Sequence, residues 1–376
     1  MTAAHALQCY ALIAGGGTTG HVQPALAIAR ALVHRGHKQS SIELVGSERG
    51  IEARLVPEAG FELTLLPGRG LQRKLSWQNV KSLGALAVAF GRAWRLVGRR
   101  RPQVVVSVGG YASVPCALAA VLRRIPVVVA EQNATPGAAN RLVARFAKAS
   151  AVSFPDTPLP RAVVTGNPVR PEVLAIDRAR DGDAARAKLG IERGRRLVLI
   201  FGGSLGALRI NQAAVDAARR WAGRSDLYIR HVVGERDWDE ITAGGPPVTS
   251  AAPLHYVAVR YDNDMPTSLA AAAVAVCRSG ASTSFELLAA GLPAVLVPSP
   301  FVTADHQTAN ARHMAATGAA VVVPDAELTG ARLVDEVEAL LADPARLAAM
   351  SAAARAAARP TAADDIAALV EANAHA

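Results

Sequence analysis

Two glycine-rich segments, each placed between a short apolar run and a helical pattern, constrain the fold more than any other feature of this sequence. Residues 15–20 read Gly-Gly-Gly-Thr-Thr-Gly, and residues 202–207 read Gly-Gly-Ser-Leu-Gly-Ala. A glycine loop between a strand and a helix lets the backbone approach a ligand, while free N–H groups and the positive helix end face an anion. Two such loops predict a nucleotide or diphosphate site in a chain built from two related halves.

Short and nearly continuous β-branched runs recur in both halves, with helical patterns between them. Such runs are expected for parallel strands that are buried on both faces of a sheet. The expected strands are residues 10–14, 42–45, 104–108 and 127–130, and then 196–201, 227–233, 254–257, 274–277 and 294–297. The sequence therefore predicts an α/β protein with two consecutive Rossmann-like, doubly wound domains and a cleft between them. A turn at residues 166–168 connects the halves, and the alanine-rich sequence from Asp335 onward predicts two helices interrupted at Pro360.

The charge of the chain is concentrated in one interval. The formal net charge is +10, yet no acidic residue lies between Glu62 and Glu131, where eleven Lys and Arg residues occur. The rest of the chain is therefore close to neutral, and the interval predicts an anionic partner such as a phosphorylated substrate, a membrane surface or a nucleic acid. Aromatic residues make up only 4% of the chain and no nucleic-acid-binding module is recognised, which argues against the last of these. A hydrophobic content of 51% excludes a disordered chain.

The middle of the acid-free interval reads as an amphipathic helix. Its expected apolar stripe consists of Val80, Leu83, Ala87, Phe90, Trp94 and Val97, and its expected basic cluster of Lys81, Arg92, Arg95 and Arg99. The uncharged run at residues 82–91 is about half of the ~20 residues needed to span a bilayer. The helix is therefore expected either to pack on the core with a solvated basic face, or to dock on an anionic membrane surface.

The cysteines and the N-terminus indicate an intracellular protein. Cys9, Cys116 and Cys277 are far apart and odd in number, so neither a disulfide framework nor a cysteine-based zinc site is expected. No basic region precedes the first apolar run, and a signal peptide is not expected either.

His21 and Glu286 are the first candidates for chemistry. His21 follows the first glycine loop, where it could simply bond a phosphate or the backbone, or act as a general base. Glu286 lies one turn into the helix that follows the small residues 278–283, where it could accept two hydrogen bonds from a ribose diol, or merely be a first-turn acid favoured by the helix dipole.

Two cofactor classes are disfavoured. The first loop matches G-x-G-x-x-G, but the tip of the second strand carries Gly46 and Ser47 instead of the acid that binds a dinucleotide ribose. Three Asp-x-Asp triplets, at 181/183, 237/239 and 262/264, could hold a divalent ion on a diphosphate, but their settings favour solvated faces and helix caps. The sequence therefore predicts neither a metal nor a cofactor.

Seven motifs, taken in order, resemble one family over nearly the whole chain. They are Gly16-Gly17-Thr18-Thr19-Gly20-His21-Val22, Gly109-Gly110-Tyr111, Glu131-Gln132-Asn133, Gly166-Asn167-Pro168-Val169-Arg170, Gly202-Gly203-Ser204-x-Gly206-Ala207, Arg278-Ser279-Gly280-Ala281-x-Thr283-x-x-Glu286 and Gly291-Leu292-Pro293. With these motifs the chain resembles the MurG family, bacterial N-acetylglucosaminyltransferases that convert lipid I to lipid II in peptidoglycan synthesis and so serve cell wall biogenesis, cell shape and cell division.

The resemblance implies a GT-B fold and an inverting, metal-independent transfer from UDP-N-acetylglucosamine. It implies residues 1–165 as an acceptor and membrane domain, residues 166–351 as the donor domain, and a C-terminal helix at about 352–376 that packs back on the first. The implied donor-binding residues are Arg170 near the uridine, Ser204 at the diphosphate, Ala281, Ser282 and Thr283 at a helix start, Glu286 on the ribose, and Gln307 with Thr308 at the sugar.

In the first domain the resemblance implies that Thr18, Thr19, Gly20 and Asn133 face the donor sugar and the acceptor, with His21 as the catalytic base and Glu131 as the alternative base. The implied partners are UDP-N-acetylglucosamine, lipid I, an anionic membrane surface, and other wall-synthesis and division proteins, without nucleic acid. A peripheral location on the cytoplasmic face of the cell inner membrane follows, and it favours the docking interpretation of the basic helix. Two alternatives stay open: a UDP-sugar epimerase on the same fold, and an inactive UDP-sugar-binding scaffold.

Overall fold

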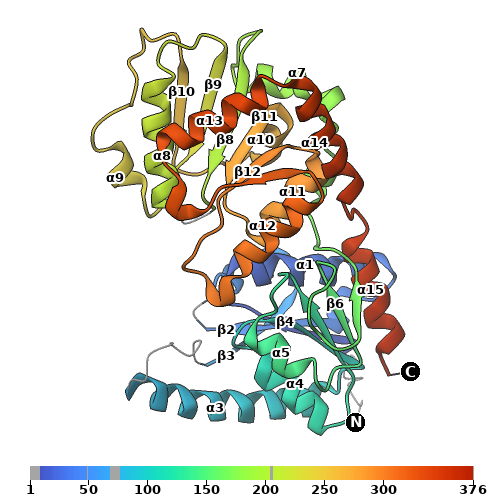
Figure 1. The fold of residues 1–376 in the computed structure, drawn as a ribbon. Coiled ribbons are helices and arrows are strands. Elements are labelled where there is room, and N and C mark those ends of the chain that lie inside the picture. Colours follow the sequence, from blue (N-terminus) through green and yellow to red (C-terminus); the bar gives the residue numbers. More distant parts are fainter. Residues whose placement is uncertain (1–8, 49, 68–76, 204–205, 376) are drawn as a thin grey trace. The chain divides into compact units, whose positions relative to one another are not determined.

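The computed structural model describes residues 9–48, 50–67, 77–203 and 206–375, and the side chains of all of these except 19, 77–83 and 85. The described chain divides into two compact units (Figure 1). Unit 1 comprises residues 1–169 and 359–376, and unit 2 comprises residues 170–358. Each unit is built around one sheet in which every strand pair is parallel.

The sheet of unit 1 has the order β3-β2-β1-β4-β5-β6-β7. Its strands are β1 (Ala11–Gly15), β2 (Ile42–Ser47), β3 (Glu62–Leu66), β4 (Val104–Gly109), β5 (Val127–Glu131), β6 (Ala149–Val152) and β7 (Ala162–Val164). The helices of unit 1 are α1 (Thr19–His34), α2 (Glu52–Glu58), α3 (Trp77–Arg100), α4 (Ser113–Leu122), α5 (Ala138–Val143) and α15 (Ala362–Asn373), with a 3₁₀ turn η1 (Gln39–Ser41). Helices α1, α2 and α15 cover one face of the sheet, and α3, α4 and α5 cover the other.

The sheet of unit 2 has the order β10-β9-β8-β11-β12-β13. Its strands are β8 (Arg196–Phe201), β9 (Leu227–Val232), β10 (His255–Val259), β11 (Ala272–Cys277), β12 (Ala294–Leu296) and β13 (Ala320–Val322). The helices are α6 (Pro171–Leu174), α7 (Arg178–Lys188), α8 (Leu208–Arg220), α9 (Trp238–Thr242), α10 (Met265–Ala271), α11 (Ala281–Ala290), α12 (His306–Ala316), α13 (Gly330–Leu341) and α14 (Pro344–Ala357), with 3₁₀ turns η2 (Thr303–Asp305) and η3 (Asp325–Glu327). Helices α8 and α13 pack together over one face, around the fully buried Trp221.

The strand orders place a topological switch point in each unit. The first strand of each sheet, β1 or β8, lies between the second and the fourth, so the chain winds to opposite sides from this point. In open parallel sheets, ligands bind outside the carboxyl ends of the strands at such a point. Both glycine loops leave the sheet there, after β1 and after β8, and the predicted doubly wound architecture is confirmed.

The nine expected strands are present, but four further strands, β3, β6, β7 and β13, were not predicted. β7 is exposed along its length and β3 is half-exposed, so neither has the continuous apolar run on which the prediction relied. β6 and β13 are only four and three residues long.

The prediction of two C-terminal helices was wrong, because three helices follow Leu328. Asp343 lies between α13 and α14 and is the N-cap of α14, because its side chain accepts from the backbone N–H of Arg346. Pro344 occupies the first position of α14. This Asp-Pro pair is a helix-start signal that the alanine-rich composition concealed. The second break falls near Pro360 as expected, and α15 then packs on unit 1 beside α1.

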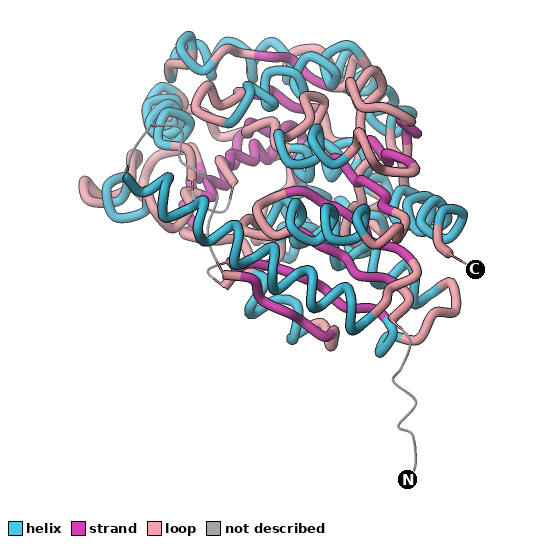
Figure 2. Tube along the Cα trace, turned by 90° about the horizontal axis from the view of Figure 1, so that it is seen from below, coloured by secondary structure: helices cyan, strands magenta, loops and turns pink. Residues whose placement is uncertain are grey.

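The apolar stripe expected on α3 is only partly correct. The residues of this helix that are buried against α4 and the sheet are Ala89, Ala93, Leu96 and Val97. Trp94 is 37% exposed and Ala87 is exposed, while the side chains of Val80, Leu83 and Lys81 lie outside the described residues. Phe90 and Val97 of the expected stripe do pack on this core, and the small side chains of Ala89 and Ala93 extend the buried face towards α4. Seen from below, the helix runs along the outside of unit 1 (Figure 2).

Candidate functional site

The first half-site is formed at the carboxyl ends of β1, β4 and β5. The glycine loop after β1 leads directly into α1, whose N-cap is Thr18 and whose first residue is Thr19. Gly110, after β4, has a φ of +83°, and a Cβ there would lie 2.4 Å from the carbonyl oxygen of Gly16. Only glycine can bring the β4 loop this close to the first glycine loop. The side chain of Thr19 lies outside the described residues.

His21 lies in the first turn of α1, beside the loop. Its Nδ1 atom is 3.1 Å from the hydroxyl oxygen of Thr18, and the Thr18 carbonyl accepts from the backbone N–H groups of His21 and Val22. A Cβ at Gly109 would lie 3.1 Å from the Nε2 atom of His21, so the end of β4 also passes close to this ring. Thr18, Gly20 and His21 are therefore grouped at one edge of the sheet.

Glu131, the last residue of β5, is buried and its carboxylate is fully engaged. It accepts from the backbone N–H groups of Asn133 and Gly137 at 3.0 and 3.1 Å, and from the amides of Asn133 and Asn140 at 3.4 and 3.0 Å. Asn140 in turn accepts from the hydroxyl of Ser107 on β4. Four N–H donors occupy a carboxylate that has about four lone-pair sites. This geometry fixes the turn that carries Asn133.

Tyr111 is a residue of the first half-site that sequence reasoning did not single out, although its motif was noted. Strand β4 brings it to the same sheet edge, and its buried hydroxyl has no hydrogen-bond partner among the described residues. Burial raises the pKa of this hydroxyl. A buried O–H without a partner is energetically costly, and the Tyr111 ring packs against the core covered by α3, α4 and α5.

The second half-site is formed at the carboxyl ends of β8, β11 and β12. The second glycine loop follows β8, although Ser204 and Leu205 lie outside the described residues. Helix α11 begins after β11 at Ala281, with Gly280 as its N-cap, so Ala281, Ser282 and Thr283 form its first turn. The backbone N–H groups of this turn have no intrahelical acceptor and suit an anion.

Segment 299–310, which follows β12, is tied to the start of α11. The hydroxyl of Ser279 donates to the carbonyl of Gln307 at 2.8 Å, and the amide of Asn310 donates to the carbonyl of Ser279 at 3.1 Å. The side-chain oxygen of Gln307 accepts from the backbone N–H of Ser299 at 2.8 Å. The hydroxyl of Thr308 donates to the side chain of Asp305 at 2.7 Å, within the start of α12. Gln307 is thus held at the half-site, while the Thr308 hydroxyl is used within its own helix start.

Glu286 is paired with Arg170 inside unit 2. The Nε atom of Arg170 donates to Oε1 of Glu286 at 2.7 Å, and the Glu286 side chain is 17% exposed. Burial disfavours the charged form of Arg170, but the bond to Glu286 outweighs this, and the pKa of Arg170 is raised. The structure therefore brings together two residues that the sequence had separated by more than a hundred positions.

The three Asp-x-Asp triplets have different settings. Asp183 is a solvated residue of α7, as expected, whereas Asp264 occupies the N-cap position of α10 without a side-chain cap and accepts instead from Lys188 and Thr267. Asp237 and Asp262, in contrast, are buried, which corrects the expectation of solvated faces and caps, and Asp262 pairs with Arg230. Among the residues described, no three His, Cys, Asp or Glu side chains are grouped as a metal site.

The three cysteines are buried and unpaired with one another, and burial raises the pKa of Cys9 and Cys116 to about 12.

Asp237, which lies against Gly206 of the second glycine loop, is the last member of a series of hydrogen-bonded polar side chains. The amide of Asn211 donates to Asp237 at 3.0 Å and to the carbonyl of Val233, so its oxygen must accept from the Nε2–H of His231 at 2.9 Å. The Nδ1 atom of His231 then accepts from the hydroxyl of Tyr256 at 2.7 Å. This arrangement fits a neutral imidazole with its proton on Nε2, and burial favours the neutral form because it lowers the pKa of His231.

This buried histidine predicts a specific loss of stability in mild acid. Burial lowers the pKa of His231 from 6.5 to about 4, so between these values only the unfolded chain takes up the proton. Stability is complete above pH 6.5 and falls as the pH decreases, by about 2 kcal/mol between pH 7 and pH 5. Urea unfolding at both pH values measures this loss. His231→Gln should lower stability at pH 7 but remove this part of the pH dependence; an unchanged pH dependence in the variant would contradict the assignment.

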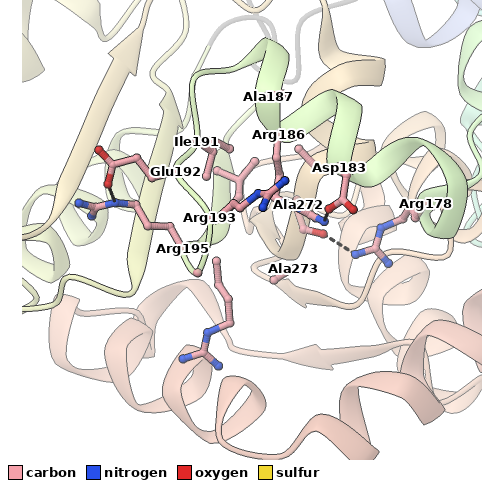
Figure 3. Close-up of a pocket in the computed structure, with 14 residues that line it drawn as sticks. Arg178, Asp183, Arg186, Ala187, Ile191, Glu192, Arg193, Arg195, Ala272 and Ala273 are labelled. Atoms are coloured by element: carbon pink, nitrogen blue, oxygen red, sulfur yellow. Dashed lines mark hydrogen bonds and ion pairs between the residues drawn. The ribbon is translucent and has the colours of Figure 1, made fainter.

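A pocket of about 740 Å³ on unit 2 lies away from these residues (Figure 3). It is lined by the starts of β8 and β11, so it lies at the amino edge of the sheet, about 20 Å along β8 from the glycine loop. Several of its charged side chains have partners: Arg195 pairs with Glu192, Arg186 with Asp183, and Arg178 donates to the carbonyl of Ala272. None of the predicted site residues that the structure describes lines this pocket, and we do not assign the predicted chemistry to it.

Two protein-domain families match consecutive parts of the chain, and together they cover most of it. The glycosyltransferase family 28 N-terminal domain matches residues 11–152, and the glycosyltransferase family 28 C-terminal domain matches residues 197–366. A relative from Desulforudis audaxviator, named UDP-N-acetylglucosamine--N-acetylmuramyl-(pentapeptide) pyrophosphoryl-undecaprenol N-acetylglucosamine transferase, is 41% identical over 96% of this chain and 97% of its own length. A relative of the same name from a Nocardioides species is 43% identical over 92% of this chain and 93% of its own.

Solved structures agree with the family match. MurG of Acinetobacter baumannii superposes with a TM-score of 0.77 at 29% identity, over 96% of this chain and 99% of its own. A UDP-GlcNAc 2-epimerase of Neisseria meningitidis has a TM-score of 0.66 at 12% identity, over 96% of this chain and 100% of its own, which shows a shared fold alone. The predicted GT-B fold is therefore confirmed, and the chain belongs to the MurG family within glycosyltransferase family 28.

Proposed function

We propose that this protein transfers N-acetylglucosamine from UDP-N-acetylglucosamine to the C4 hydroxyl of the N-acetylmuramyl residue of lipid I, giving lipid II for peptidoglycan synthesis. The observation that carries the proposal is the nearly full-length identity of 41% to a relative named for this transfer. The geometry supports it, because each unit presents a glycine loop and a helix start at its switch point, as a diphosphate-linked donor and a diphosphate-linked acceptor require.

The donor is assigned to unit 2. The helix starts of α8 and α11 would face the UDP diphosphate, Glu286 would accept from the ribose hydroxyls, and Gln307 would bind the sugar. The acceptor is assigned to unit 1, at the first glycine loop and at Asn133. Ser204 belongs to the donor assignment, although it lies outside the described residues.

The reaction is an inverting displacement at the anomeric carbon. The acceptor hydroxyl oxygen forms a bond to this carbon on the face opposite the UDP, the bond to the UDP oxygen breaks, and the hydroxyl proton passes to a base. The transition state has oxocarbenium character, as in glycoside hydrolysis. The negative charge that develops on UDP is stabilised by N–H groups at the helix starts of unit 2, which are fixed before the reaction.

His21 is the better candidate for the base. Its imidazole lies beside the first glycine loop, with Nδ1 3.1 Å from the Thr18 hydroxyl, whereas the carboxylate of Glu131 already accepts from four N–H donors. Proton transfer to Glu131 would require some of these bonds to break. We therefore assign Glu131 the role of holding the Asn133 turn.

The activity is tested by incubation with UDP-N-acetylglucosamine and a soluble lipid I analogue, following UDP release with and without a chelator. Turnover that requires both substrates and survives chelation supports the proposal. Release of UDP or formation of an epimer without the acceptor would favour the epimerase, which shares the fold. Donor binding without any turnover would favour the inactive scaffold.

Helix α3 and the end of α4 support docking on an anionic membrane. Three large apolar side chains are exposed there: Val88 by 53%, Trp94 by 37% and Leu122 by 64%. The same helix and the end of α4 carry the basic residues Arg92, Arg95, Arg99, Arg123 and Arg124, of which Arg92 pairs with Glu48. The guanidinium of Arg123 lies 3.9 Å above the Trp94 ring, which places α4 beside α3. No helix in the described part of the chain is long and apolar enough to cross a bilayer. We call these eight residues the docking surface.

Docking predicts binding to vesicles that depends on charge. Each basic residue near an anionic surface contributes about 1 kcal/mol. Replacing Arg95 and Arg99 together by Gln should therefore weaken binding to phosphatidylglycerol-containing vesicles by roughly 30-fold at low salt, measured by co-sedimentation. Val163→Ser, on the edge strand β7 at the other side of the sheet, removes an exposed apolar residue outside the docking surface and should leave binding unchanged. Binding that is insensitive to anionic lipid and to salt would overturn the proposal.

A further inference from the structure

Each glycine loop lies against a buried carboxylate that the sequence analysis did not connect with it. Glu52, the first residue of α2, is 1% exposed, and Asp237, the N-cap of α9, is 4% exposed. The two occupy the same place in the two units. Glu52 comes five residues after Ser47, the last residue of β2, and Asp237 comes five residues after Val232, the last residue of β9. β2 and β9 are the strands that pair with β1 and β8, from which the loops leave.

In unit 1 the carboxylate holds the loop by direct hydrogen bonds. Both oxygens of Glu52 are 3.1 Å from the backbone nitrogen of Gly17, and Oε1 also accepts from the N–H and the hydroxyl of Ser47 at 2.7 and 2.9 Å. A Cβ at Gly16 would lie 2.2 Å from Oε1, so the loop backbone is packed directly on the carboxylate. The Gly17 N–H therefore points at Glu52 and is not available to a ligand, and the loop cannot shift without breaking these bonds.

In unit 2 the carboxylate holds the loop by packing and through the helix that follows. Gly206 has a φ of +91°, and a Cβ there would lie 2.7 Å from Oδ2 of Asp237 and 2.5 Å from the carbonyl of Val233. The same Oδ2 accepts from Asn211 in the first turn of α8 at 3.0 Å, and Arg236 neutralises the carboxylate at 2.7 Å. Asp237 thus fixes the end of the loop and the start of α8 relative to β9.

A buried carboxylate near an anion site works against anion binding, so it needs a physical reason. Anions bind where N–H groups are preorganised, and a glycine loop is intrinsically mobile because glycine has the largest backbone freedom. A buried carboxylate removes this freedom in one of two ways. It can accept from loop N–H groups that point away from the ligand, or it can pack directly on a loop glycine that has no side chain. The cost of the negative charge is limited in each case by its own donors: three from Gly17 and Ser47 to Glu52, and Asn211 with Arg236 to Asp237.

We propose that Glu52 and Asp237 are positioning residues, one for each half of the reaction: Glu52 sets the first glycine loop and with it His21, and Asp237 sets the second glycine loop and the start of α8. The proposal rests on the proposed function for the assignment of acceptor and donor. It requires the two residues to act separately, because each touches only the loop of its own unit.

The test compares Glu52→Gln and Asp237→Asn in the full chain, with UDP binding by calorimetry and turnover of a soluble lipid I analogue. Glu52→Gln should lower kcat at least tenfold while the Kd for UDP stays unchanged, because loop displacement misplaces the base. Asp237→Asn should weaken UDP binding about tenfold, with the KM for the acceptor unchanged. Equal losses of both parameters in both variants, or no loss in either, would overturn the proposal.

Two control carboxylates separate positioning from general stability. Glu43 is 3% exposed on β2 and pairs with Arg100. Asp226 precedes β9 and pairs with Arg224. Neither is held against a glycine loop. Glu43→Gln and Asp226→Asn should lower unfolding stability without changing kcat or the Kd for UDP. Hydrogen exchange at the Gly17 amide gives a readout that does not depend on the reaction. Exchange should accelerate in Glu52→Gln and not in Glu43→Gln, and an unchanged rate would overturn the Glu52 assignment even if the protein proved to have another activity.

Discussion

Replacement of His21 by Ala is expected to lower kcat by 10²- to 10⁴-fold while leaving the KM for UDP-N-acetylglucosamine and the unfolding stability nearly unchanged. The imidazole lies in the first turn of α1, beside the glycine loop to which the acceptor is assigned. For Nε2 to accept the proton, Nδ1–H must donate to the hydroxyl of Thr18, 3.1 Å away. Steady-state kinetics with a soluble acceptor measure the effect.

The Thr18 contact provides an internal control for the histidine prediction. Thr18→Ser keeps the hydroxyl that orients the ring, and should retain most of kcat, whereas Thr18→Val removes the acceptor for Nδ1–H and should lower kcat. Near-normal turnover in His21→Ala, with unchanged donor affinity, would exclude His21 as the base. Glu131 would then have to be reconsidered, despite its four N–H donors.

Much of the fold could be predicted because the local signals agree with the tertiary structure. Buried parallel strands such as β4 and β8 are continuous apolar runs, and each glycine loop marks a strand end and a helix start at once. The missed strands lack this agreement. β7 is exposed on an edge, and it is a strand only because β6 lies beside it, which no local pattern records.

The candidate site was likewise predictable only in part: the positions of its residues could be predicted, but the partners of their side chains could not. The positions of His21, Glu131 and Glu286 at strand ends or helix starts follow from local sequence. What their side chains do depends on partners that are distant in the chain: Arg170 lies 116 positions before Glu286, and Gly17 lies 35 before Glu52. Glu131 is the clearest case: the resemblance implied it as the alternative base, and only the structure shows that its carboxylate accepts from the backbone N–H groups of Asn133 and Gly137.

Replacement of Glu286 by Gln is expected to weaken UDP binding by about 10- to 100-fold, which corresponds to hydrogen bonds to a charged group of about 1.5–3 kcal/mol. One oxygen of the carboxylate accepts from Arg170 at 2.7 Å, and the remaining lone pairs can accept from both ribose hydroxyls. The amide of Gln offers one acceptor oxygen and also loses the charge that Arg170 pairs with. Arg170 would then be left partly buried without its partner, which adds to the loss.

A comparison of UDP with 2′-deoxy-UDP separates loss of the ribose contact from a general disturbance of unit 2. In the wild type the missing hydroxyl should cost about tenfold in affinity, whereas in Glu286→Gln the two nucleotides should bind almost equally, because the group that distinguishes them is gone. Glu240→Gln, on the exposed surface of α9, removes a carboxylate of the same unit outside the half-site and should discriminate as the wild type does. If Glu286→Gln kept the full preference for UDP, the carboxylate would serve only to pair with Arg170, and the ribose would have to be recognised by other residues of the half-site.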